Sequence, residues 1–184
     1  MLLGWISAAQ AQEIRGGYVG LSYGSFDFTS DQEFGFVISD SAGAYRAFGG
    51  YQLNSNYAVE ATWGKTDDIK EGFGLVDPVF GNVSLDLMVD YEIATVRFLG
   101  MAPLSSISIF GGAGFFDANF NRSVHYQDAF EVIDIADSDS DSGLMILGGI
   151  QFELRRIAIR GEYEWFDTDN VEATTITVSA LLRF

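Results

Sequence analysis

The sequence predicts an all-β fold, specifically an eight-stranded antiparallel up-and-down transmembrane β-barrel. Eight segments alternate between apolar and polar or small residues, which is the period of a strand with two unlike faces. The connections between these segments are long at one end and short at the other, as in barrels that cross a membrane. No apolar run approaches the roughly 18 residues of a membrane helix, so a chain of this kind can cross a membrane only as strands.

The first predicted feature along the chain is a processing segment. Residues 1–11 are apolar and end in Ala9-Gln10-Ala11, a pattern typical of a secretory cleavage site. We therefore expect residues 1–11 to be the remnant of a signal peptide and residues 12–184 to form the barrel domain. The apolar run is short and no Lys or Arg precedes it. A misplaced start codon and a disordered N-terminus are the alternatives.

Four strands are predicted in the first half of the chain. They are Gly17–Phe26, Tyr45–Leu53, Tyr57–Lys65 and a fourth strand that ends near Phe98. In the fourth, the apolar residues change parity, from Leu85, Leu87, Val89, Tyr91 and Ile93 to Ala94, Val96 and Phe98. This change indicates either a β-bulge near Ile93 or a strand that starts near Tyr91.

Four more strands are predicted in the second half. They are Ile107–Phe116, Leu144–Leu154, Ile157–Phe166 and Thr174–Phe184. The first of these is rich in glycine and its facing is ambiguous. The last alternates apolar and polar residues up to a terminal Phe184, and we expect it to close the barrel by pairing with the seventh and the first strands.

The long connections are predicted to lie together at one end of the barrel. They are Phe28–Ala44, Thr66–Asp90, Asp117–Gly143 and Asp167–Ala173. The other connections are short turns, so both termini are expected at the short-turn end. Eight strands leave an interior just wide enough for side chains.

Three stretches carry a family resemblance. They are Arg46–Asn54 with Tyr57–Glu60, Gly148–Leu154 with Ile157–Trp165, and the C-terminal strand ending on Phe184. Together they resemble the OmpA-like, porin-family small barrels of the bacterial outer membrane. The resemblance implies a monomer with its termini in the periplasm, in contact with outer-membrane lipid and lipopolysaccharide. It also implies that the assembly machinery reads Phe184 as part of its signal. OmpA itself continues into a periplasmic domain, which we do not expect here.

Charged residues on the strands are predicted to face the lumen. If the apolar parity faces lipid, the opposite parity places eight charged side chains inside: Arg46, Glu60, Arg97, Glu153, Arg160, Glu162, Glu164 and Arg183. Isolated charges would be costly there, whereas mixed signs allow ion pairs. The resemblance implies an interior charged cluster at Glu60, Arg97, Arg160 and Glu162. The cluster is either a static plug or the gate of a narrow pore, and the small interior favours the plug.

The acidic residues are concentrated in the predicted long connections. The formal charge is −16, which argues against a nucleic-acid partner. Of the 26 acidic residues, 21 lie in or beside the four long connections. We therefore expect a structural or surface-interaction role for acidic extracellular loops. Asp137, Asp139 and Asp141 are weak candidate ligands for Ca²⁺ or Mg²⁺. The EF-hand pattern is absent, so a solvated loop is the main expectation and a divalent-bridged contact with lipopolysaccharide a minor one.

An enzyme and a soluble ligand-binding barrel are the two alternatives from other classes of protein. The only histidine, His125, lies near Ser123 and Asp128, which is weak evidence for a lipid A-modifying enzyme. There is no P-loop, zinc-binding spacing or nucleophile elbow, so we expect neither an enzyme nor a cofactor. A soluble lipocalin-like barrel would place apolar residues in its cavity and charge outside, the reverse of the facing expected here.

Overall fold

The computed structural model describes residues 16–30, 38–67, 69–77, 81–127, 132–167 and 171–184. The strands are β1 (Gly16–Ser30), β2 (Ile38–Gln52), β3 (Tyr57–Thr66), β4 (Ile69–Asp77), β5 (Gly81–Leu104), β6 (Ile107–Gln127), β7 (Val132–Leu154), β8 (Ile157–Asp167) and β9 (Val171–Arg183). The predicted signal segment 1–11 lies outside the described residues. All pairings between neighbouring strands are antiparallel. No helix among the described residues is long and apolar enough to span a membrane.

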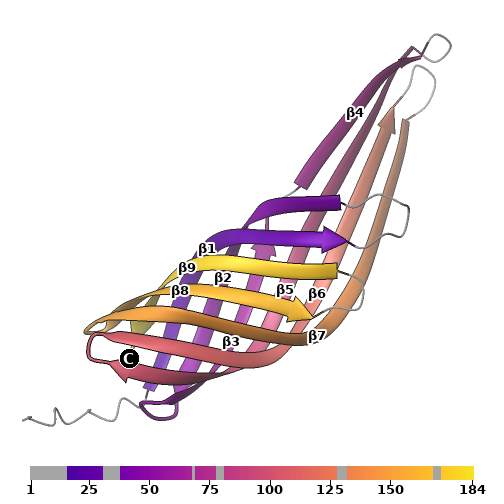
Figure 1. The fold of residues 1–184 in the computed structure, drawn as a ribbon. Coiled ribbons are helices and arrows are strands. Elements are labelled where there is room, and N and C mark those ends of the chain that lie inside the picture. Colours follow the sequence, from indigo (N-terminus) through magenta and orange to yellow (C-terminus); the bar gives the residue numbers. More distant parts are fainter. Residues whose placement is uncertain (1–15, 31–37, 68, 78–80, 128–131, 168–170) are drawn as a thin grey trace, which may run out of the picture.

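The sheet closes into an eight-stranded barrel, which confirms the predicted fold class (Figure 1). The strand order is β3-β2-β1-β9-β8-β7-β6-β5-β4, and an additional pairing of β3 with β5 closes the ring. The last strand, β9, pairs with both β8 and β1, as its alternating pattern led us to expect. β4 also pairs with β5, beyond the part of β5 that pairs with β3, so it adds no strand to the wall.

Two of the predicted long connections are largely strand, so that part of the sequence interpretation is wrong. Within 66–90 the chain forms β4 and the start of β5, and 117–143 contains the end of β6 and the start of β7. These segments form two hairpins that rise well beyond the barrel end (Figure 1). From the sequence they are predicted as connections, because they lie between the clearest alternating segments. Antiparallel pairing satisfies the backbone N–H and C=O groups of these segments.

We call this projection the protruding sheet: β4, residues 81–91 of β5, residues 117–127 of β6 and residues 132–143 of β7. Its strands are hydrogen-bonded to one another in the order β4-β5-β6-β7. The neighbouring strands β1, β2, β8 and β9 end much closer to the barrel (Figure 1).

Both interpretations of the predicted fourth strand are corrected. β5 pairs with β6 in one unbroken register, from Ser84 opposite Gln127 to Leu104 opposite Ile107, so it has no bulge near Ile93 and starts well before Tyr91. The irregularity lies on the opposite side, where Lys65 faces Glu92 but Ile69 faces Val89. The register along this side of β5 therefore changes where its partner changes from β3 to β4. Tyr91 and Ile93 are apolar because they face the barrel interior, where both are buried.

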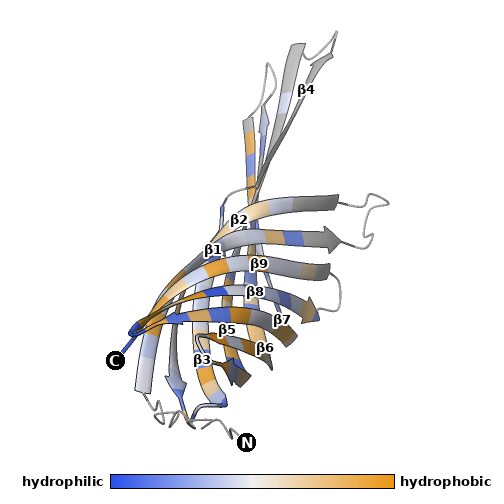
Figure 2. Cartoon of the chain, turned by 60° about the vertical axis from the view of Figure 1, so that its left-hand side comes forward, coloured by the Kyte–Doolittle hydropathy of each residue, from blue (hydrophilic) through white to orange (hydrophobic). Residues whose placement is uncertain are grey.

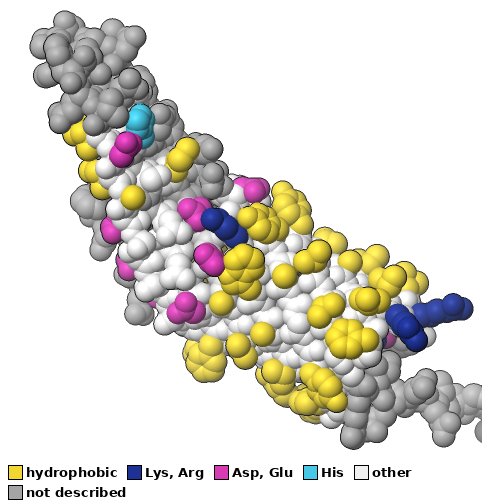
Figure 3. Space-filling view, turned by 180° about the vertical axis from the view of Figure 1, so that it is seen from behind, with side chains coloured by type: hydrophobic (Ala, Val, Ile, Leu, Met, Phe, Trp, Pro, Cys, Tyr) yellow, Lys and Arg dark blue, Asp and Glu magenta, His cyan; other side chains and the backbone are white. Residues whose placement is uncertain are grey.

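The outward parity of the barrel strands is apolar and exposed. Leu21 and Phe115 are each 70% exposed. We call this surface the apolar belt; its members include Val19, Leu21, Val59, Val96, Ile109, Phe115, Ile146, Ile150, Ile159 and Val178. Figure 2 shows the alternation of apolar and polar residues along the strands, and Figure 3 shows apolar side chains gathered over the barrel wall. An apolar surface of this extent is suited to lipid. The lipocalin-like alternative, with charge outside, is therefore wrong.

The inward parity is buried and alternates aromatic with charged layers. Phe110 and Phe116 of β6 both face inward, which resolves the facing that the glycine-rich pattern left ambiguous. Glycines make room for these rings: a Cβ on Gly20 would lie 2.3 Å from the Cζ atom of Phe48, and one on Gly149 would lie 2.6 Å from that of Phe110. The lumen is thus packed with side chains, as expected for eight strands.

Candidate functional site

The centre of the lumen holds a charged network built from four strands. β8 supplies Arg160, Glu162 and Glu164 from alternate positions, so all three point inward as a row. Arg46 of β2, Glu60 of β3 and Arg97 of β5 come from the other strands of the wall. All six side chains are buried, with Glu60 only 1% exposed and Glu164 fully covered. We call these six residues the lumen network.

Glu60 is held by three donors. Its Oε1 accepts a hydrogen bond of 2.8 Å from Nε of Arg97, and Nη2 of Arg97 contacts the same oxygen. Its Oε2 accepts bonds from Nη1 of Arg160 at 2.8 Å and from the hydroxyl of Tyr18 at 2.9 Å. Both carboxylate oxygens are therefore satisfied, as a buried ionised group requires.

Arg97 is the hub of the lumen network. Besides Glu60, it donates from Nη1 to Oε1 of Glu162 at 2.8 Å and to Oε1 of Glu164. Its Nη2 also lies 3.2 Å from Oε2 of Glu162. One guanidinium therefore binds three carboxylates, using the fork of donors that only arginine offers.

Arg46 closes the network on the side of β9. Its Nη1 donates to Oε2 of Glu164, and its Nη2 donates to Oγ1 of Thr175 at 2.9 Å. The Thr175 hydroxyl in turn donates to Oε2 of Glu164 at 2.7 Å. The three arginines and three glutamates balance in formal charge. The network thus offsets the cost of removing its charges from water, provided that every member is present.

The remaining two predicted residues form a second pair that connects to the network. Arg183 binds Glu153 through two hydrogen bonds of 2.8 Å each. Gln151 links the two groups, because its Nε2 donates to Glu153 at 3.1 Å and its Oε1 accepts from Nε of Arg160 at 3.1 Å. All eight charged residues assigned to the lumen by parity therefore lie in one connected set of contacts. Among the described residues, Nε of Arg183 is the one buried side-chain polar atom without a hydrogen-bond partner.

Aromatic rings lie on both sides of the lumen network, and they were not among the residues singled out from the sequence. On the side of the short turns, below the network, the Arg160 guanidinium carbon lies 5.9, 5.4 and 5.0 Å from the ring centroids of Tyr18, Phe48 and Phe110, within cation–π range. On the side of the protruding sheet, above the network, Phe26, Tyr91, Phe116 and Phe166 pack against one another. The signal was available, since each of these rings has the inward parity of its strand.

The aromatic layer above the network leaves a small apolar pocket. The pocket has a cavity volume of about 20 Å³ and is lined by Phe26, Tyr91, Ile93, Phe116, Ala118, Phe120, Phe166 and Ala173. One of these rings, Phe166, lies over the Arg46 guanidinium, 6.0 Å from its carbon to the ring centroid. Side chains therefore fill the lumen at each level, from the Glu153–Arg183 pair to the upper rings.

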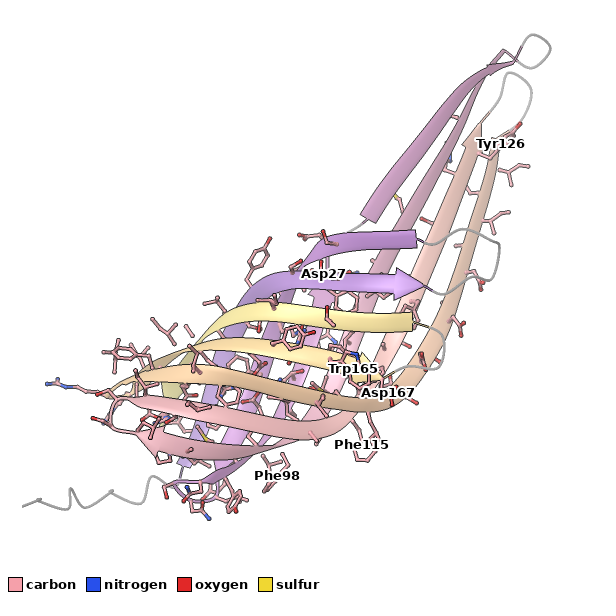
Figure 4. All side chains as sticks on the ribbon, viewed as in Figure 1. Asp27, Phe98, Phe115, Tyr126, Trp165 and Asp167 are labelled. Carbon is pink, nitrogen blue, oxygen red and sulfur yellow. The ribbon has the colours of Figure 1, made fainter. Side chains whose placement is uncertain are left out.

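Exposed acidic residues mark the end of the apolar belt. Asp27, Asp67, Asp117 and Asp167 come from different strands or strand ends, and we call these four residues the acidic rim. Figure 3 shows acidic side chains between the apolar belt and the far end of the protruding sheet. Figure 4 shows Asp27 and Asp167 near the barrel end, Phe98 and Phe115 pointing outward, and Tyr126 near the tip of a protruding hairpin.

The weak metal candidates lie in a strand and not in a loop. Asp137, Asp139 and Asp141 occupy alternate positions of β7, and each accepts a hydrogen bond from the backbone N–H of the serine that follows it. No group of three or more potential metal ligands lies close together in the described part of the chain.

Of the three residues named as weak evidence for an enzyme, the structure describes Ser123 and His125. Ser123 and His125 share the outward parity of β6, and Nδ1 of His125 lies 2.5 Å from a carboxylate oxygen of Asp134 across the β6–β7 pair. Asp128 lies outside the described residues.

Comparison with known proteins gives a family match and several structural neighbours. The family model described as outer membrane protein beta-barrel domain matches residues 1–184. No curated protein matches the sequence.

Among solved structures, the attachment invasion locus protein Ail of Yersinia pestis, in complex with the heparin analogue sucrose octasulfate, superposes with a TM-score of 0.58 at 19% identity; the match covers 92% of this chain and 99% of Ail. Neisserial surface protein A gives a TM-score of 0.56 at 15% identity, over 92% of this chain and 97% of that one. The N-terminal β-barrel domain of Pseudomonas aeruginosa OprF gives 0.54 at 9% identity, over 93% and 100%. At these identities the neighbours establish the fold alone.

Proposed function

The chain belongs to the outer membrane protein beta-barrel domain family, and from this premise we propose that it is a plugged barrel that presents an acidic protruding sheet at the cell surface. The family confirms the resemblance to small outer-membrane barrels and a location in the bacterial outer membrane. The observation that carries the proposal is the order of surfaces along the barrel axis. An exposed apolar belt is followed by the acidic rim and then by the protruding sheet.

The proposed role assigns the lumen network to structure and not to transport. Six mutually paired charges between two aromatic layers tie four of the eight wall strands together from within, since they join β2, β3, β5 and β8 across the lumen. A narrow pore is the second candidate. It is favoured by one observation: Arg97 contacts three carboxylates and could exchange one for another.

The proposed orientation places the protruding sheet outside the cell and the short turns and both termini in the periplasm. The chain has no cysteine, so single cysteines can report the side. We expect a membrane-impermeant maleimide to label Ser140→Cys in intact cells but to label Ser106→Cys, at the β5–β6 turn, only after the outer membrane is permeabilised. Labelling of Ser106→Cys in intact cells, with Ser140→Cys protected, would reverse the orientation.

The charge of the surface narrows the class of partner. Ail was solved with a sulfated heparin analogue, but this chain carries a formal charge of −16, which repels polyanions. We expect a basic peptide to bind and sucrose octasulfate not to bind at low ionic strength, with binding of the peptide lost as salt is raised. Calorimetric titration with each probe checks this; binding of the octasulfate alone would contradict the acidic-surface role.

Lipopolysaccharide is the proposed neighbour of the acidic rim. Its phosphates and the rim carboxylates are both anionic, so contact between them requires a divalent cation that takes oxygen ligands from both. We expect Ca²⁺ to raise the thermal unfolding midpoint in vesicles that contain lipopolysaccharide. The rise should be smaller in the triple variant Asp67→Ala, Asp117→Ala, Asp167→Ala. An unfolding midpoint that is equal with Ca²⁺ and with EDTA would remove this part of the proposal.

A further inference from the structure

The protruding sheet has an unpaired edge along β7. β8 follows β7 only as far as Asp167, which pairs with Leu144. Beyond that point, residues 132–143 of β7 pair with β6 and with no other described strand. A free strand edge above a membrane is a template for pairing with another chain, and proteins usually blunt such edges.

The direction of the backbone N–H groups along this edge follows from the register. The N–H of Glu153 donates to the carbonyl of Ser106, so it points toward the β5–β6 turn and hence toward β6. The register between β6 and β7 is unbroken from Ile107 opposite Phe152 to Gln127 opposite Val132. N–H directions alternate along a strand. Odd-numbered residues of β7 therefore donate toward β6, and even-numbered residues point toward the free edge.

Three consecutive outward-pointing donors are occupied by aspartate side chains. The N–H groups of Ser138, Ser140 and Ser142 donate to Oδ1 of Asp137, Asp139 and Asp141 at 2.9, 2.8 and 2.8 Å. An incoming antiparallel strand would need these three donors to form its ladder. It would find them already bonded, beside a row of like charges.

We propose that Asp137, Asp139 and Asp141 cap the free edge of β7 and thereby prevent a second copy of this chain from pairing along it. The alternation of aspartate and serine, considered from the sequence as a possible set of metal ligands, is then an edge cap. Its two elements are an acceptor for three consecutive outward N–H groups and a negative charge at each second position. A second copy would bring the same charges opposite its own, and like charges facing each other across a strand pair are destabilising.

The test compares three variants in the refolded full-length barrel. The first changes Asp137, Asp139 and Asp141 to alanine, which removes both acceptors and charges. The second changes the same residues to asparagine, which keeps an acceptor on each side chain but removes the charges. The third changes Asp67, Asp117 and Asp167 to alanine, which removes the same charge elsewhere. Analytical ultracentrifugation in detergent gives the oligomeric state, and heat-modifiable migration on a gel verifies that each variant is folded.

We expect the alanine variant to shift from monomer to dimer at protein concentrations where the wild type, the asparagine variant and the rim variant stay monomeric. In the wild type, we expect amide hydrogen exchange at Ser138, Ser140 and Ser142 to be about 2- to 10-fold slower than in the monomeric fraction of the alanine variant, the effect of one modest hydrogen bond. A folded alanine variant that remains monomeric would contradict the proposal. So would an asparagine variant that dimerises as readily as the alanine variant, because the side-chain acceptors would then contribute nothing to the cap. If the alanine variant fails to fold, Asp139→Ala alone, which leaves two caps, should show faster exchange at Ser140 only.

Discussion

At the scale of single residues, the barrel depends on charges that are individually unfavourable and jointly balanced. Arg97 is the clearest case, since its guanidinium serves Glu60, Glu162 and Glu164 in a water-poor lumen. Removing one partner of a buried ion pair leaves an uncompensated charge, and that penalty is larger than the net value of the pair. The network is therefore more sensitive to deletion of a single member than its contribution to stability suggests.

We predict that Arg97→Met lowers the free energy of unfolding by about 3–5 kcal/mol, because three carboxylates lose their shared partner. Urea unfolding of the refolded barrel in detergent, followed by tryptophan fluorescence, measures the change. Arg155→Met is the matched control, because Arg155 is exposed in the β7–β8 turn and should change stability by no more than about 0.5 kcal/mol. Equal effects of the two substitutions would mean that Arg97 is not buried in a closed network.

The sequence predicts part of this site and not the rest. Parity along each strand is sufficient to assign charged side chains to the inner face, because the period of a strand is two. Parity does not show which arginine pairs with which glutamate. Glu164 binds Arg46, 118 positions away, and only the shear and closure of the barrel bring those strands face to face. The rings around Arg160 share the inward parity, but parity does not show that they lie against a guanidinium.

At the scale of strands, the wall of the barrel follows the alternation in the sequence and the protruding sheet does not. β3 and β8 bury every second residue almost without exception, because lipid lies on one side and packed side chains on the other. In the protruding sheet, residues 133–140 of β7 are exposed on both faces of the strand. A strand in this environment needs no alternation of apolar and polar residues. Prediction failed where the environment no longer differs between the two faces.

The lipid-facing parity gives a test within a single strand. We predict that Val96→Arg, in the middle of the apolar belt, costs about 2–4 kcal/mol in lipid vesicles, whereas Leu104→Arg, at the turn end of β5, costs about 0–1 kcal/mol. Both side chains are exposed and point outward, so they differ mainly in depth. Urea titration of each variant refolded in the same vesicles measures the costs. Equal costs at the two depths would contradict the placement of the belt in the membrane.

The terminal strand gives a second test at this scale. The N–H of Phe184 donates to the carbonyl of Gly17 at 3.0 Å, while its side chain is mostly exposed. If the ring is read during assembly, Phe184→Ala should strongly reduce insertion in cells and leave refolding in detergent close to normal. Leu182→Ala, another outward residue of β9, is the control. The measurement is the amount of folded protein in outer-membrane fractions. Equal amounts of the Phe184→Ala and Leu182→Ala variants would argue against recognition of the Phe184 ring during assembly.

At the scale of the whole molecule, layers of charged, aromatic and apolar side chains follow one another along the barrel axis. The Glu153–Arg183 pair, the lower rings, the lumen network and the upper rings follow one another inside, while the belt, the acidic rim and the protruding sheet follow one another outside. The inner series fills the lumen and holds the strands together; the outer series fits lipid below and water above. We therefore interpret the barrel as a plugged support for the protruding sheet. The alternative that most needs an experiment is a narrow pore.

The most direct test of this account is single-channel recording of the refolded wild-type protein in planar lipid bilayers. We predict a current no different from that of the bare bilayer, because paired charges and aromatic rings occupy the lumen at each level. A steady conductance that changes with Glu60→Ala or Arg160→Ala would contradict the account, since it would show that ions pass through the lumen network.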